Sequence, residues 1–167
     1  MTMVEAALSL VFFGLVLGVS FVLCRVGWDS WSTNSARVIM VENLRKVQAW
    51  MAIDLSQAGA VTISDVPADG TWYHAISFQR ASTVTNGAIV WGEVMSYALG
   101  GSHGDQLVRT SSGGANPVAV NIVSFDLRRQ TATPNIIEAH VSTHQKTGRS
   151  ADEDLTKSLD FMILMRN

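Results

Sequence analysis

The feature that most constrains this chain is an uncharged apolar segment near its N-terminus. The segment runs from Ala6 to Cys24, with Glu5 directly before it and Arg25 directly after it. Its length is close to the roughly 20 residues that an α-helix needs to cross the hydrocarbon core of a membrane. Because an ionisable group at the edge of such a helix is costly, we expect the carboxylate of Glu5 to be there for a partner.

A secretory signal peptide and a plain single-pass anchor are two simpler interpretations of this segment. A signal peptide has a basic region before its apolar core, whereas residues 1–5 contain one acid and no base. The apolar run is also followed by a continuing helical pattern instead of a small-residue cleavage site. A plain anchor, with Arg25 as its positive cytoplasmic flank, remains an alternative.

The helical pattern continues through residues 35–58, where apolar side chains recur at steps of three and four. They are Met40, Leu44, Val47, Met51, Leu55 and Ala58. This spacing predicts an amphipathic helix that lies on a sheet and ends at Gly59. We expect it to form one long rod with the apolar segment. The sequence leaves open a bend near Gly27 and local unwinding between Gly14 and Val22.

After Gly59 the apolar pattern changes to a period of two, which is typical of strands. Six strands are predicted, over residues 72–80, 88–99, 106–110, 118–128, 136–142 and 159–166. Short turn clusters between them, such as residues 85–87, favour antiparallel pairing, and residues 145–157 are predicted to form a polar surface loop. The expected fold class is therefore α+β. Its three parts are an apolar helix (1–26), an amphipathic continuation (27–58) and a β-rich head (59–167).

Composition and motifs favour no chemistry of their own. The net charge is −2 and the basic residues are scattered, so no nucleic-acid surface is evident. Cys24 is the only cysteine, which excludes an internal disulfide.

His140 and His144 would lie about 13 Å apart along a strand, too far for one metal ion. The acids at 152–154 lack the pattern of a calcium loop. Because nucleophile and phosphate-binding motifs are absent, we expect no catalysis, no metal and no cofactor. The two other histidines, His74 and His103, belong to no metal-binding or catalytic motif and do not change this expectation.

The N-terminal stretch MTMVEAALSLVFFGLVLGVSF resembles the mature N-terminus of type IV pilins and pseudopilins. In that family residue 1 is hydrophobic and is exposed by cleavage, and residue 5 is Glu. The resemblance implies a pilin-like fold, with a long N-terminal helix packed on an antiparallel sheet. Two departures are that Val22 replaces the proline of many members and that no short basic leader ending in Gly precedes Met1. N-methylation of residue 1 stays open.

The same resemblance implies a structural subunit of a type IV pilus or of a type II secretion pseudopilus. Glu5 would pair with the N-terminal amine of Met1 in a neighbouring subunit, and Thr2 would add a hydrogen bond. The apolar side chains that would pack in the filament core are Leu8, Val11, Phe12, Leu15, Val19 and Val22. The implied partners are further copies or other pilins and an inner-membrane assembly platform. The chain would span the inner membrane once before assembly and belong to a periplasmic or extracellular filament afterwards.

The later part of the chain is similar, through shorter motifs, to the larger minor pseudopilin of type II secretion and its type IV pilus counterpart. These motifs are LRKVQAWMAIDLSQAGAV, then Val94, Tyr97 and Leu99, Leu107-x-Arg109, Val120–Leu127 and Pro134. The similarity implies a minor subunit that initiates assembly, although major and minor subunits are not separated by sequence. The alternative function is a membrane-anchored extracytoplasmic binding or adhesin domain that does not polymerise.

Overall fold

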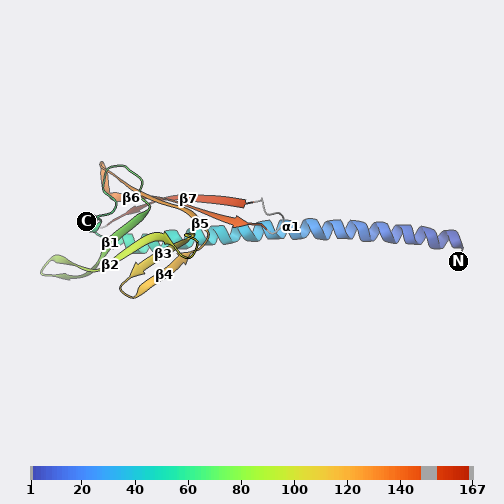
Figure 1. Cartoon of the computed structure of the whole chain (residues 1–167), viewed down its shortest axis with the longest axis horizontal. Helices are drawn as coiled ribbons and strands as arrows, with labels where there is room; N and C mark the ends of the chain where they lie inside the picture. The colour runs from blue at the N-terminus through green and yellow to red at the C-terminus, as the bar shows by residue number, and fades with distance from the viewer. Residues whose placement is uncertain (1, 148–153, 166–167) are drawn as a thin grey trace.

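The computed structural model describes residues 2–147 and 154–165 as a long helical rod with a β-rich head at one end (Figure 1). The rod is one unbroken helix, α1 (Met3–Ser56), and a 3₁₀ turn follows at Ala60–Thr62. Among the described residues, the head contains seven strands: β1 (Ala75–Thr85), β2 (Ala88–Gly100), β3 (Gln106–Ser111), β4 (Gly114–Ala119), β5 (Ile122–Gln130), β6 (Thr133–Lys146) and β7 (Asp154–Leu164). The expected α+β class, with one long N-terminal helix and antiparallel strands, is confirmed.

The strands form two antiparallel sheets, one of order β1-β2-β3-β4 and one of order β5-β6-β7. The single strand predicted over residues 118–128 is wrong, because β4 ends at Ala119 and β5 begins at Ile122. Asn121 lies between them with a φ of 58°, a left-handed conformation that Asn tolerates better than most residues. The chain leaves the first sheet and enters the second at this residue.

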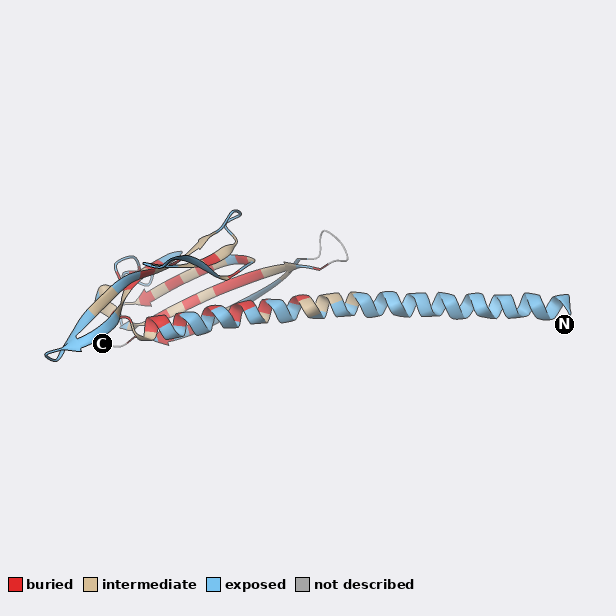
Figure 2. Cartoon of the chain, turned by 90° about the horizontal axis from the view of Figure 1, so that it is seen from below, coloured by how far each residue is buried: buried red, intermediate tan, exposed pale blue. Residues whose placement is uncertain are grey.

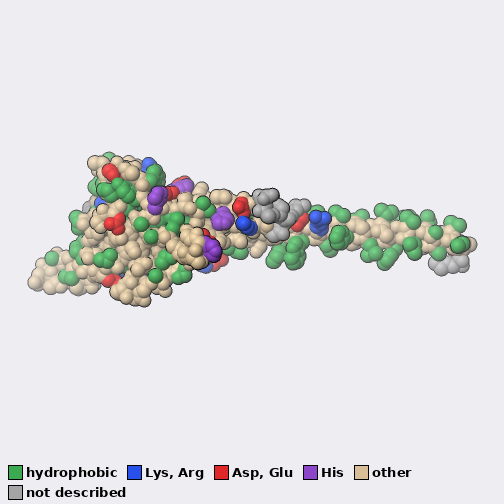
Figure 3. Space-filling view, in the orientation of Figure 1, with side chains coloured by type: hydrophobic (Ala, Val, Ile, Leu, Met, Phe, Trp, Pro, Cys, Tyr) green, Lys and Arg blue, Asp and Glu red, His purple; other side chains and the backbone are tan. Residues whose placement is uncertain are grey.

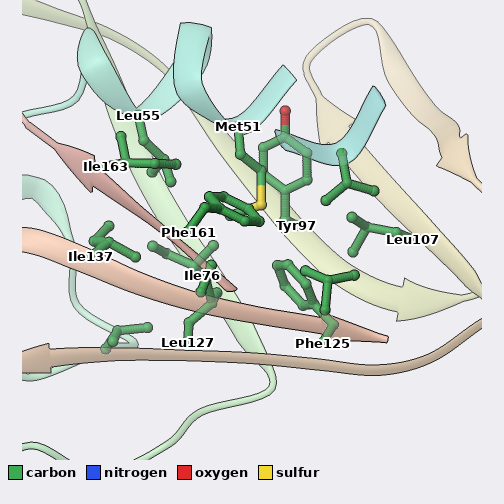
Figure 4. Packing of buried hydrophobic residues seen from close by; sticks show 14 of the residues in the cluster. Met51, Leu55, Ile76, Tyr97, Leu107, Phe125, Leu127, Ile137, Phe161 and Ile163 are labelled. Carbon is green, nitrogen blue, oxygen red and sulfur yellow. The ribbon is translucent and has the colours of Figure 1, made fainter. Parts of the chain in front are cut away.

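The second half of α1 packs against both sheets. Its buried side chains, among them Met40, Leu44, Val47, Met51 and Leu55, follow the predicted spacing and form a stripe along one side of the helix (Figure 2). Side chains from α1 and from both sheets meet in one apolar cluster (Figure 4). Within this cluster the rings of Phe78 and Tyr97 are stacked, with centroids 6.2 Å apart. The amphipathic helix therefore supplies one wall of the core, as the sequence indicates.

The end of α1 differs from the predicted stop at Gly59. The helix ends at Ser56, where the N–H of Gln57 donates to the carbonyl of Asp54 at 3.2 Å and the N–H of Ala58 donates to the carbonyl of Leu55 at 3.1 Å. Gly59 instead allows a close approach, because a Cβ at this position would overlap the indole ring of Trp91. The glycine thus marks a packing contact between the chain after α1 and β2.

The β6–β7 hairpin is longer than predicted. Residues 145–146 and 154–157 belong to strands, with Lys146 opposite Asp154, so the loop predicted over 145–157 is wrong at both ends. Cross-strand pairing extends the ladder through a polar stretch that has no apolar alternation to reveal it. Asp152 and Glu153 lie outside the described residues.

Candidate functional site: the N-terminal half of α1

The first half of α1 projects from the head as an apolar surface. Every residue from Met3 to Trp28 is exposed, and Figure 2 shows this half of the rod without a buried position. In the space-filling view, hydrophobic side chains follow it over most of its length (Figure 3). With about 1.5 Å of rise per residue, the whole helix of 54 residues is about 80 Å long. By length and composition, it is able to cross a membrane.

The six residues predicted to pack in a filament core lie on one side of this helix. They are Leu8, Val11, Phe12, Leu15, Val19 and Val22, and their spacing of three, one, three, four and three residues keeps them in one stripe. All six are exposed in the single chain. The structure therefore groups them, and their packing partners stay a prediction.

Gly14 and Gly18 lie one turn apart on the same part of the helix and leave a shallow groove. A Cβ built at either position meets no other atom within 4 Å. The groove is lined by these glycines together with Leu15, Val19, Val22 and Leu23. The helix is continuous through this region, so the unwinding left open by the sequence is not present here. The helix is also unbroken at Gly27, so the bend that the sequence allows there is not present.

The serine hydroxyl groups of the apolar segment bond to the helix itself. Ser9 donates to the carbonyl of Glu5 at 2.9 Å, and Ser20 donates to the carbonyl of Val16 at 2.8 Å. A polar group that is satisfied within its own helix costs less in lipid or in an apolar bundle. These two serines therefore fit an apolar environment.

Glu5 caps the helix on which it lies. Its carboxylate accepts the N–H of Thr2 at 2.8 Å, and the hydroxyl of Thr2 accepts the N–H of Glu5 at 3.4 Å. This reciprocal arrangement is a capping box, and the negative charge also suits the positive end of the helix dipole. The predicted assembly residues Thr2 and Glu5 are thus brought together within one chain. Met1, the third of them, lies outside the described residues.

Trp28 and Trp31 lie where the apolar segment gives way to the amphipathic half. Their ring centroids are 5.5 Å apart, and both side chains are exposed. Indole rings at such a boundary suit the interface between a membrane and water, or a contact with a neighbouring molecule. The structure is compatible with both of these environments.

Two histidines of the head contact carboxylates of neighbouring strands or loops. His74 Nδ1 lies 2.7 Å from Asp126 Oδ1, and His140 Nδ1 lies 2.6 Å from Asp160 Oδ1. Within residues 2–147 and 154–165, no group of three or more His, Cys, Asp and Glu side chains is arranged to hold a metal ion.

Sequence reasoning missed a buried ionic cluster that joins the end of α1 to the four-stranded sheet. Asp54, with only 1% of its surface exposed, accepts hydrogen bonds from the Tyr97 hydroxyl and Arg109 Nε, both at 2.7 Å. Arg80 Nη1 approaches the other carboxylate oxygen at 3.4 Å. Burial, and then the bond to Asp54, raise the pKa of Tyr97, and the bond to Asp54 raises the pKa of Arg109.

A buried cation, Arg129 of β5, holds the chain that follows α1. Its guanidinium donates to the carbonyls of Pro134, Val66 and Ala60 at 2.9, 3.1 and 3.2 Å. Burial lowers the pKa of Arg129. The sequence signal available for the two clusters was the acid Asp54, in the predicted helix, and three arginines that lie in or directly after predicted strand segments. These side chains come together only once the helix and the sheets meet.

Comparison with protein-family models, with curated proteins and with solved structures gave no match to this chain. What the chain shows by itself is a long, exposed, apolar N-terminal helix that continues into an amphipathic half packed on antiparallel sheets.

Proposed function

We propose that this chain is a structural subunit of a type IV filament, either a type IV pilus or a type II secretion pseudopilus. The observation that carries the proposal is the first half of α1, which is apolar on every side and has a single acid at its start. Such a helix needs an apolar environment all around it. Lipid supplies that environment before assembly, and sister helices supply it afterwards.

Assembly would join Glu5 of one subunit to the N-terminal amine of the next. In the apolar interior of a helical bundle a carboxylate and an amine stabilise each other only as a pair, because either alone is a buried unpaired charge. A single polar pair at a fixed position also sets the axial register between helices. The groove at Gly14 and Gly18 would let a sister helix approach closely. An initiating role as a minor subunit is part of this proposal.

Cohesion would come from the apolar stripe that begins at Leu8. Transfer of roughly 1,000 Å² of this surface from water into a bundle corresponds to some tens of kcal/mol before the entropy of association is subtracted, at about 25 cal/mol per Å². The same surface makes the chain a single-pass inner-membrane protein before assembly. An inner-membrane platform would then move it into a periplasmic or extracellular filament.

The test separates the charge of Glu5 from its role as a cap. Gln keeps the capping box, since Glu and Gln both serve at that position, but it cannot form an ion pair. We expect both Glu5→Gln and Glu5→Ala to abolish filaments while the protein stays in the membrane, because the unpaired amine costs about 3–5 kcal/mol at each contact. Electron micrographs of sheared filaments and immunoblots of membranes provide the readout.

Glu42→Gln is the matched control, because Glu42 is an exposed acid of α1 that pairs with Lys46 of the same helix. Its filaments should match those of the unmodified protein. Normal filament yield from Glu5→Gln would show that Glu5 serves only its own helix, and the proposed pairing would then be wrong.

The second candidate is a membrane-anchored extracytoplasmic binding or adhesin domain that does not polymerise. It is favoured by the capping box, because the carboxylate of Glu5 already has partners within its own chain. Such a domain would function with residues 6–24 replaced by an unrelated apolar helix. A filament subunit would lose assembly on this replacement, so the one exchange distinguishes the two functions.

A further inference from the structure

The head carries an uncovered β-hairpin at its far end, formed by residues 81–92 of β1 and β2. We call this segment the distal arm. Its tip lies at the end of the molecule farthest from the N-terminus (Figures 1 and 2). Asn86 and Gly87 turn the chain there with φ values of 54° and 80°, as a tight two-residue hairpin loop requires. All residues from Ala81 to Val90 are exposed, so neither face of this part of the arm is packed on the head. The base of the arm contacts the head, where Trp91 packs against Gly59.

The strand edges of the distal arm are unpaired in the described part of the chain. On the β1 side, the segment after α1 covers the strand only as far as Ala81, whose N–H donates to the carbonyl of Gln57 at 3.0 Å. On the β2 side, pairing with β3 covers residues 96–100 and does not reach the arm. A strand edge with free N–H and C=O groups is a template for another strand.

The sequence of the arm, ASTVTNGAIVWG, contains no charged residue and no proline. Natural sheets usually protect a free edge with charges or proline, and other strands of this head follow that rule. The edge strand β4 contains Pro117, and β7 carries Asp154, Lys157 and Asp160. The distal arm therefore lacks the protection that neighbouring strands possess.

Its composition suits pairing with an identical strand. The β-branched residues Thr83, Val84 and Thr85 favour extended backbone. Since the arm is uncharged, two copies can meet without the repulsion of like charges placed opposite each other. A lone two-stranded hairpin is marginally stable in water, whereas three or more strands that share a hydrophobic face are able to form a stable unit. Pairing would therefore stabilise both arms.

We propose that the distal arms of two copies pair edge to edge in an antiparallel arrangement and join two molecules end to end. In this antiparallel pair the two arms lie side by side, and the two heads lie on opposite sides of the contact. The two α1 helices therefore point away from each other. The contact thus links chains that are held in two different membranes or filaments. It does not rest on filament assembly through Glu5.

The experiment uses the full chain reconstituted into phosphatidylcholine vesicles. Wild-type vesicles should cluster, as measured by dynamic light scattering. Val84→Lys and Ile89→Lys each place a charge on the arm, at side chains that are exposed. Each should slow clustering by about tenfold or more, because two like charges then meet across the contact. Circular dichroism would confirm that the variants are folded.

Val61→Lys is the matched control, since the same change is made at a valine that is 86% exposed and lies outside the arm. Its vesicles should cluster like the wild type. If Val61→Lys slowed clustering as much as the arm variants do, general apolar adhesion would drive clustering and the proposal would be wrong. Unchanged clustering of both arm variants would overturn it as well. So would an absence of clustering by the wild type.

Mixing two differently labelled vesicle populations tests whether the distal arm pairs with the distal arm of a second copy. Vesicles that carry Val84→Lys and vesicles that carry Val84→Glu should each cluster poorly alone but should cluster together, because the two arms then bring opposite charges to one contact. Failure of the mixture to cluster would mean that the arm docks on another surface, and it would overturn self-pairing. Glu5→Gln vesicles should cluster normally, which keeps this result separate from the test of filament assembly.

Discussion

At the scale of single residues, Asp69 shows how a local contact couples stability to pH. Its carboxylate accepts the backbone N–H of Thr71 at 2.8 Å and the hydroxyl of Tyr73 at 2.7 Å. These two donors favour the charged form and lower the pKa of Asp69, the bond from Thr71 contributing most. The contacts order the chain between α1 and β1.

We expect the stability gained from Asp69 to be present above its unfolded pKa of 3.8 and to be lost as the pH falls through its lower folded pKa. The difference in unfolding free energy between wild type and Asp69→Asn should therefore shrink as the pH falls below about 3.8. Urea titrations followed by tryptophan fluorescence at several acidic pH values measure it. A difference that stays constant over this range would contradict the assignment, and Tyr73→Phe should reduce the pH-dependent part.

Residue identity also explains where sequence reasoning succeeded and failed at this scale. The Asn86-Gly87 pair is predicted as a turn, and both residues adopt the left-handed conformation that the turn needs. Asn121 adopts it too, but it is surrounded by strand-forming residues and follows no turn pattern. Its role depends on which sheet each neighbouring segment joins, and no local signal carries that information.

At the scale of elements, the contact between α1 and the four-stranded sheet depends on Asp54. The side chain comes from the last turn of the helix, and its partners Tyr97 and Arg109 come from β2 and β3. The ring centroid of Trp50, one turn earlier in α1, lies 5.2 Å from the guanidinium carbon of Arg109. Arg109 is therefore held by two residues of one helical turn, through an ion pair with Asp54 and a cation–π contact with Trp50.

We expect Asp54→Ala to lower the free energy of unfolding of the head by about 1–3 kcal/mol, because it leaves the buried Tyr97 hydroxyl and the partly buried Arg109 without their acceptor. The loss in Asp54→Asn should be smaller, since this variant keeps an acceptor for Tyr97. Chemical denaturation of the full chain in detergent is the measurement. Glu42→Ala, which breaks the exposed pair with Lys46, should leave the denaturation midpoint unchanged. A loss of similar size in Glu42→Ala and Asp54→Ala would argue against the role of burial.

The boundaries of elements were predictable only where an apolar pattern runs through them. The apolar members of the buried stripe of α1, from Met40 to Leu55, were predicted, because a helix on a sheet must bury every third or fourth side chain. The polar side chains Asn43 and Asp54 are buried in the same stripe, and the apolar spacing did not predict them. The outer parts of β6 and β7 are polar, and their pairing depends on register with each other. The sequence of each strand alone does not contain that register.

At the scale of the whole molecule, the head and the first half of α1 are structurally independent. The apolar cluster of the head takes its first helical member at Leu44 and includes no residue of the apolar segment. We therefore expect replacement of residues 6–24 by an unrelated apolar helix to leave the denaturation midpoint of the head unchanged. Tryptophan fluorescence in detergent measures it, and Leu44→Ala, which opens a cavity at a cost of about 2–5 kcal/mol, serves as the positive control. A large shift on helix replacement would show that the apolar segment does contribute to the head.

The sequence by itself determined the apolar segment, the acid at its start, the amphipathic continuation and the alternation of the strands. Each is a periodic or compositional property that any fold of this chain must satisfy, because apolar side chains leave water wherever the backbone places them. Only the tertiary structure decided that the strands divide into two sheets at Asn121, that Asp54 meets two arginines, and that the distal arm stands uncovered. These features join residues far apart in the chain, and their energies exist only after the helix and both sheets have come together.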